Sequence, residues 1–235
     1  MPRKPRHYLP GVPAHVIQRG NNRQACFFEE ADYRTYLDYL GEAALRHGCR
    51  IHAYVLMTNH VHLLLTPNTV LGISRLIQSI GRRYVRYVNE LYARTGTLWE
   101  GRHKGHLIQS ERHLLQCYQY VELNPVRAGM VTSPANYRWS SYRHHALGEQ
   151  DPIIEGHQSY DGLGKTAEHR QRVYRDLFVK HLGAEVLDDI RRAAQYCVPL
   201  GNGRFKRQIE QALGRKVGHA KRGRPKKVIL LGMTR

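Results

Sequence analysis

The sequence has few cysteines, and none has the spacing of a structural site. The four, Cys26, Cys49, Cys117 and Cys197, lie far apart in 235 residues, and no Cys-x-x-Cys pair occurs. This spacing argues against a zinc knuckle and a disulfide framework. A reducing, cytoplasmic environment is therefore expected.

Long apolar runs are also missing. No stretch approaches the roughly 18 consecutive apolar residues that indicate a membrane span, and the basic start, MPRKPRHYLPG, leads into no apolar signal-peptide segment. We therefore expect neither a membrane partner nor export.

Acidic residues are scarce relative to basic ones. The chain has 37 Lys and Arg against 19 Asp and Glu, which gives a formal net charge of +18. A field of this sign concentrates polyanions and releases their counterions on contact, so nucleic acid is the leading partner. A solvated basic surface is the alternative. With a nucleic-acid partner, the expected cytoplasmic location is at the nucleoid.

Apolar residues make up 41% of the chain, and their spacing predicts an α+β fold. The β-like runs IHAYVLM and HVHLLLT are joined only by Thr58 and Asn59, which predicts an antiparallel hairpin. The expected strands are 13–20, 51–57, 60–66 and 98–108, and the expected helices are 31–48, 70–92 and 111–123, the last capped by Ser110 and stopped by Asn124-Pro125. This order is an antiparallel sheet with a split βαβ, ferredoxin-like plan.

We expect three parts along the chain. Residues 1–146 would form the sheet-containing domain, residues 147–166 a linker, and residues 167–235 a helical, basic C-terminal extension that binds DNA. From Arg204 onward, eleven Lys and Arg accompany a single Glu. Arg222 and Arg224 of the segment KRGRPKK fit an A·T-rich minor groove, and a solvated tail is the alternative.

The stretch MTNHVHLLL places two histidines one residue apart in an apolar run. On a strand, alternate side chains share a face, so His60 and His62 point one way while Val61, Leu63 and Leu65 point the other. Two imidazoles on one face suit a metal ion, and two hydrogen-bonded, partly buried histidines are the alternative. With 15 histidines in the chain, about one such pair is expected by chance, so the pair alone decides nothing.

A second polar group is expected on the helix that follows Ser110. Tyr120 and Asn124 stand four residues apart and therefore share a face of that helix. Tyr118 lies on the apolar stripe with Leu114, whereas Tyr120 falls off that stripe. The phenol of Tyr120 and the amide oxygen of Asn124 are therefore expected to contact the same part of the protein or its ligand.

The segments AYVLMTNHVHLLL, LWEGRHKG, YQYVELNPVRAGMV and YRWSSY, in this order, closely resemble the single-tyrosine HUH transposases, particularly the REP-associated tyrosine transposases of bacteria. The resemblance spans about residues 8 to 145. It implies that His60 and His62 hold a divalent metal, that Asn124 completes the metal site and that Tyr120 is the catalytic nucleophile. Asparagine at this last position is typical of the REP-associated branch, whereas relatives that mobilise insertion sequences often carry glutamine.

The resemblance also implies the reaction and its substrate. Tyr120 would attack a DNA phosphodiester, expel the 3′ hydroxyl and form a 5′-phosphotyrosine that is rejoined to another 3′ hydroxyl. The substrate would be single-stranded DNA of short palindromic repeats folded as hairpins. Two imidazoles and one amide oxygen suit Mn²⁺ better than Mg²⁺, and we expect either ion to work. Both monomers and homodimers occur among such enzymes.

Several basic residues are expected to contact DNA. Some lie in family-like segments, some on the basic face of the expected helix 70–92, and some in the tail. They are Arg19, Arg23, Arg82, Arg83, Arg86, Arg102, Lys104, Arg222 and Arg224.

Two other functions stay open at this point. A repeat-binding regulator without catalysis would keep the basic surface and have no need of Tyr120. A phosphodiesterase that uses metal-activated water would cleave DNA without a covalent adduct. The joint presence of His60, His62, Tyr120 and Asn124 favours the transposase.

Overall fold

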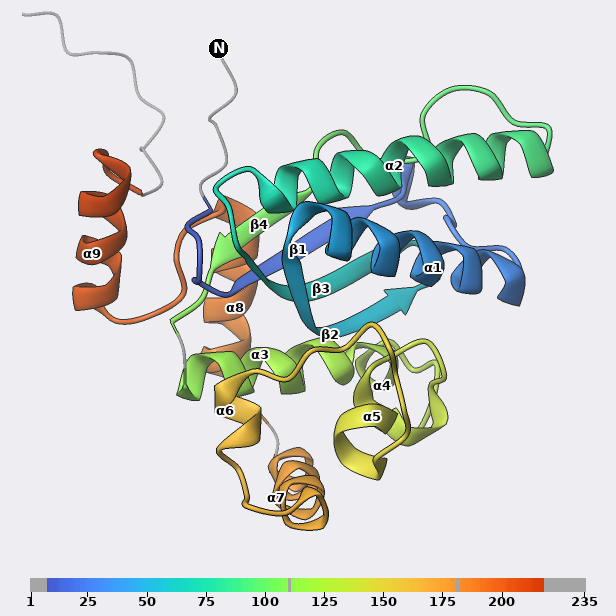
Figure 1. Ribbon diagram of the computed structural model, residues 1–235. Coiled ribbons are helices and arrows are strands. Elements are labelled where there is room, and N and C mark those ends of the chain that lie inside the picture. Colours follow the sequence, from blue (N-terminus) through green and yellow to red (C-terminus); the bar gives the residue numbers. More distant parts are fainter. Residues whose placement is uncertain (1–7, 110, 181, 218–235) are drawn as a thin grey trace, which may run out of the picture.

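The computed structural model describes residues 8–109, 111–180 and 182–217. They contain one antiparallel sheet in the order β2-β3-β1-β4, built from β1 (Ala14–Arg19), β2 (Cys49–Met57), β3 (His60–Pro67) and β4 (Lys104–Leu107). Strand β3 lies between β1 and β2 and is antiparallel to both, so β1 and β2 run parallel to each other. Helix α1 (Glu30–His47) crosses between them (Figure 1). The predicted α+β fold with a split βαβ plan is confirmed.

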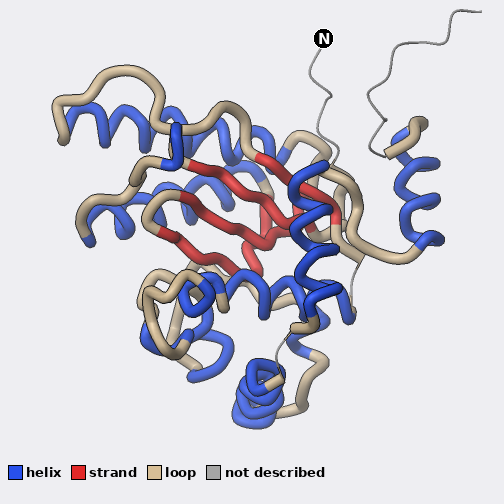
Figure 2. The backbone as a smooth tube through the Cα atoms, turned by 180° about the vertical axis from the view of Figure 1, so that it is seen from behind, coloured by secondary structure: helices blue, strands red, loops and turns tan. Residues whose placement is uncertain are grey.

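The sheet separates two apolar cores, because alternate residues of β3 point to opposite faces. Val61, Leu63 and Leu65 lie in the core beneath α1 and α2 (Gly72–Leu91). Leu64 lies in the second core, together with side chains of α3 (Arg112–Glu122). The helices therefore form a layer on each side of the strands (Figure 2).

The remaining helices follow α3 with one exception, the short 3-10 turn after β1. Their bounds are η1 (Asn21–Arg23), α4 (Asn124–Arg127), η2 (Pro134–Asn136), α5 (Tyr142–Leu147), α6 (Gln158–Asp161), α7 (Ala167–Val179), α8 (Ala184–Tyr196) and α9 (Gly203–Leu213). Within the described ranges, no helix is long and apolar enough to cross a membrane.

Residues expected to form a linker are packed against the sheet domain in the structure. Ile154 forms a bridge with Ile51 of β2, and Asp151 accepts a hydrogen bond of 2.7 Å from the hydroxyl of Tyr54. Tyr160 of α6 is buried. This segment thus packs against the first core near Ile51 and Tyr54 and reaches the second core at Tyr160.

A buried carboxylate connects the helices of the second core. Glu122, at the end of α3, accepts hydrogen bonds from Ser141 at 2.6 Å, from His145 at 2.9 Å and from the hydroxyl of Tyr174 at 2.6 Å. All four side chains are buried. Because a buried carboxylate is costly unless it is hydrogen-bonded, this network fixes α7 and α5 to α3.

Two expectations fall on residues outside the described ranges. One is the helix cap at Ser110, and the other is the groove-binding segment with Arg222 and Arg224.

Candidate functional site

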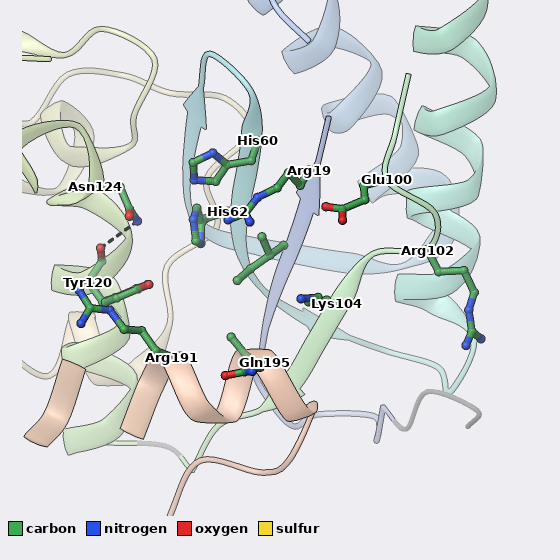
Figure 3. Close-up of a pocket in the computed structure, with 12 residues that line it drawn as sticks. Arg19, His60, His62, Glu100, Arg102, Lys104, Tyr120, Asn124, Arg191 and Gln195 are labelled. Atoms are coloured by element: carbon green, nitrogen blue, oxygen red, sulfur yellow. Dashed lines mark hydrogen bonds between the residues drawn. The ribbon is translucent and has the colours of Figure 1, made fainter. Parts of the chain in front are cut away.

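A pocket of about 340 Å³ opens where β1, β3 and β4 meet α3 and α8 (Figure 3). The sequence-predicted side chains that it brings together are those of His60, His62, Tyr120, Asn124, Arg19, Arg102 and Lys104. These residues come from four separate segments of the chain. Their convergence is the main structural observation about the site.

The two histidines share the pocket face of β3, as their alternation predicted. His60 Nδ1 lies 2.6 Å from the side-chain oxygen of Asn59, and the two imidazole centroids are 5.0 Å apart. Burial lowers the pKa of His60 to about 4 and the pKa of His62 well below its usual value. Both rings are therefore neutral near pH 7, which is the form that binds a metal.

A third histidine, missed by the sequence analysis, stands behind His62. His15 of β1 places its Nε2 2.7 Å from Nδ1 of His62, and both rings are buried. If His62 donates its Nδ1 proton to His15, its Nε2 lone pair is left for a ligand in the pocket. The alternating pattern of β1 could have revealed this contact, because His15 occupies the same sheet face.

Tyr120 and Asn124 reach the pocket from consecutive helices. Tyr120 is on α3, whereas Asn124 begins α4 after a break at Leu123. The Asn124 amide nitrogen donates to the carbonyl of Tyr120 at 3.0 Å and to that of Val121 at 3.1 Å. These bonds orient the amide and leave its oxygen as an acceptor (Figure 3). The adjacent Tyr118 is fully buried in the second core, as its place on the apolar stripe predicted.

The pocket residues fit a divalent metal, with only a few protein ligands to offer. Among the described residues, no group of three or more His, Cys, Asp or Glu side chains is placed to hold an ion. A site of His60, His62 and the Asn124 oxygen thus supplies three neutral ligands, and the rest of the shell would come from water or from substrate oxygens. Such an open shell with few protein ligands suits Mg²⁺ or Mn²⁺ better than a structural zinc site.

The pocket also contains residues that sequence reasoning missed. Arg191 and Gln195 enter from α8, and Glu100 from the loop before β4. Arg127 of α4 places its guanidinium 4.4 Å from the centroid of the Tyr120 ring and donates a hydrogen bond to the Tyr120 carbonyl. Of these residues, only Arg127 could have been found from the sequence, because it lies in the family-like segment YQYVELNPVRAGMV, three residues after Asn124.

Other expected DNA contacts lie away from this pocket. Helix α2, which covers the opposite face of the sheet, carries Arg82, Arg83 and Arg86. Arg83 pairs with Glu42 at 2.6 Å, and Arg86 pairs with Glu90 at 2.7 Å. Arg23 ends the η1 turn that follows β1. These residues remain a predicted DNA surface separate from the pocket.

The fold is that of tyrosine transposases. A solved structure of a REP-associated tyrosine transposase bound to a REP hairpin aligns with a TM-score of 0.55 at 18% identity, over 67% of this chain and 93% of that chain. A second solved structure, from Deinococcus radiodurans R1 and described provisionally as a transposase, is 28% identical over 51% of this chain and 95% of that chain, with a TM-score of 0.37. No curated protein matches the chain.

The family follows from the sequence match. Residues 9–124 match the family model described as "Transposase IS200 like". Over these residues the chain belongs to the IS200-like transposases, and it is a DNA transposase. The matched segment ends at Asn124, so α5 to α9 lie beyond it.

Proposed function

We propose that this transposase cuts and rejoins single-stranded DNA beside hairpin-forming repeats, with Tyr120 as the nucleophile. The observation that carries the proposal is the convergence of Tyr120, Asn124, His60 and His62 in one pocket. Tyr120 is 8% exposed, so a phosphodiester must enter the pocket to reach its hydroxyl. A strand free of its partner enters such a recess more easily than a duplex does.

The reaction consumes no reagent other than the DNA. The Tyr120 oxygen attacks phosphorus and its phenolic proton leaves, while the bond to the 3′ oxygen breaks and that oxygen is released as a hydroxyl. A 5′-phosphotyrosine results, and the reverse reaction with another 3′ hydroxyl rejoins the strand. The phosphodiester bond energy is conserved in the tyrosyl ester.

His60, His62 and Asn124 would hold the metal, Mn²⁺ or Mg²⁺. When bound, the ion supplies Lewis-acid polarisation of the scissile phosphate. The side chains of Arg19 and Lys104 add positive charge to the same pocket and would hold the backbone of the incoming strand.

The proposed substrate is a DNA hairpin of the repetitive palindromic class. The match to a transposase solved with a REP hairpin supports this choice, as does the formal charge of +18. The protein would act on the nucleoid, where such repeats lie. Since one chain supplies every pocket residue named above, we propose that a monomer is sufficient for cleavage.

The test uses hairpin DNA with a single-stranded flank, labelled at either end and incubated with Mn²⁺. A 5′-phosphotyrosine keeps the 3′ label on the protein in a denaturing gel and releases the 5′ label as a free strand. We expect Tyr120→Phe and a chelator each to abolish the adduct. Tyr118→Phe is the matched control, because that hydroxyl is buried without a hydrogen-bond partner among the described residues.

The other outcomes separate the alternatives. Cleavage that survives Tyr120→Phe would indicate a metal-activated water as the nucleophile. Binding of several hairpins with neither adduct nor cleavage would indicate a repeat-binding regulator.

A further inference from the structure

Helix α8 belongs to the region expected to be an appendage, yet it forms one wall of the pocket. Its buried residues Ile190 and Ala193 anchor it in the second core. Arg191 and Gln195, four residues apart, emerge on the pocket side. The pocket is therefore completed by residues that lie outside the segment matching the transposase family.

Arg191 lines the same pocket as the proposed nucleophile. In Figure 3 its side chain points from α8 toward Tyr120. The Tyr120 ring is in contact with Arg127, whose guanidinium lies 4.4 Å from its centroid. Arg127 thus contacts the ring, and Arg191 adds a second positive charge to the pocket from a different helix.

The two guanidinium groups carry like charge, and an anion bound between them would offset their repulsion. Burial lowers the pKa of Arg127, the neighbouring Tyr120 opposes this shift, and the positive charge of Arg191 adds to it. Arg191 pairs with the exposed Asp188, 3.4 Å away on the same helix. A guanidinium group that lines the pocket of a nucleophile matches the oxygens of a phosphate, which accept its hydrogen bonds.

We infer that Arg191 binds the non-bridging oxygens of the phosphate that Tyr120 attacks, while Arg127 holds the Tyr120 ring and carbonyl. The inference rests on the proposed function and adds α8 to the active site. Negative charge grows on these oxygens during attack, so the contact strengthens in the transition state.

The next residue in the chain provides a matched control. Arg192 has the same charge and lies on the same helix, but it does not line the pocket, and its side chain is 67% exposed beside Asp189. Arg191 is 57% exposed, so its replacement removes little buried surface. A difference in activity between the Arg191 and Arg192 variants therefore reflects the position of the side chain and not the net charge of the protein.

The experiment measures the full-length chain with the labelled hairpin and Mn²⁺ at saturating protein. We expect Arg191→Ala to slow formation of the covalent adduct by about 10²-fold or more, the usual loss for one such donor, and Arg192→Ala to change it less than twofold. Arg191→Lys should retain part of the rate, and added guanidinium ion should partly restore Arg191→Ala. Equal rates for the two alanine variants would overturn the inference.

A second measurement is independent of catalysis. The slope of log affinity against log salt for hairpin binding should fall by about 0.7 in Arg191→Ala, the value for one phosphate contact on a single strand, and stay unchanged in Arg192→Ala. If the wild type forms no adduct, the proposed function fails, while this slope still decides whether Arg191 contacts a phosphate. Unchanged slopes in both variants would contradict the contact.

Discussion

At the residue scale, the orientation of His62 depends on a neighbour that touches no substrate. The imidazole of His62 has two nitrogens, and only the one facing the pocket is useful as a ligand. His15 engages the other at 2.7 Å. Such an outer partner fixes the tautomer of a metal-binding histidine and commonly contributes about 10- to 100-fold to metal affinity.

Replacing His15 should therefore weaken metal binding directly. We expect His15→Leu to lower the affinity for Mn²⁺ by about 10- to 100-fold, measured by calorimetry without DNA. His15→Gln should restore much of this affinity, since its amide oxygen can accept the Nδ1 proton of His62. His52→Gln is the control, because His52 is buried on β2 but bonds to the Glu155 carbonyl and to Thr66. Equal Mn²⁺ affinity in His15→Leu and the wild type would refute the role.

At the element scale, α3 must hold Tyr120 against the sheet while its end turns into α4. The hydrogen bonds of Glu122 to α5, α7 and Ser141 fix this end from behind. The predicted stop at Asn124-Pro125 corresponds to the observed break at Leu123, because Pro125 has no backbone N–H to donate to the carbonyl of Val121, which accepts from the Asn124 side chain instead. The position of the nucleophile thus depends on packing that lies outside the pocket.

Glu122→Ala should strongly destabilise the protein. Three buried donors would lose their acceptor, so we expect the free energy of unfolding in urea to fall by about 3 to 5 kcal/mol. Glu90→Ala, which removes an exposed pair with Arg86, should cost less than about 1 kcal/mol. A loss for Glu122→Ala no larger than that of Glu90→Ala would show that the network contributes little.

The same scale shows what the sequence could predict. The hairpin of β2 and β3 was expected within two residues of its bounds, because a two-residue turn between alternating apolar runs is a local signal. The apolar stripe of α2 is also a local signal, because its residues recur every three or four positions. The place of α8 was not predictable, since its sequence carries no motif and its contacts with β1, β4 and α3 exist only in the folded chain.

At the scale of the whole molecule, the sheet separates two basic surfaces. Arg19, Lys104 and Arg191 face the pocket, whereas the arginines of α2 lie on the other side. A hairpin bound at the pocket would have to extend around the sheet edge to meet α2. The predicted contacts therefore divide into a group at the cleavage site and a group suited only to DNA further away.

The sheet also buries histidines, and this makes the stability of the molecule depend on pH. Burial lowers the pKa of His52 and of His60 to about 4, and that of His106 to about 3. Since an unfolded histidine titrates near 6.5, the unfolded chain binds more protons between this value and the folded pKa. The stability from the neutral rings is complete above pH 6.5 and is lost as the pH falls toward 4.

We therefore expect acid unfolding between pH 6.5 and 4, measured by circular dichroism in urea with a chelator present. His52 alone should account for about 3 kcal/mol of the loss, from a shift of about 2.5 units at 1.36 kcal/mol each. His52→Gln keeps a donor for Glu155 and an acceptor for Thr66 but cannot titrate, so its free energy of unfolding should fall less steeply with acid. A variant with the same pH slope as the wild type would mean that folding does not lower the pKa of His52.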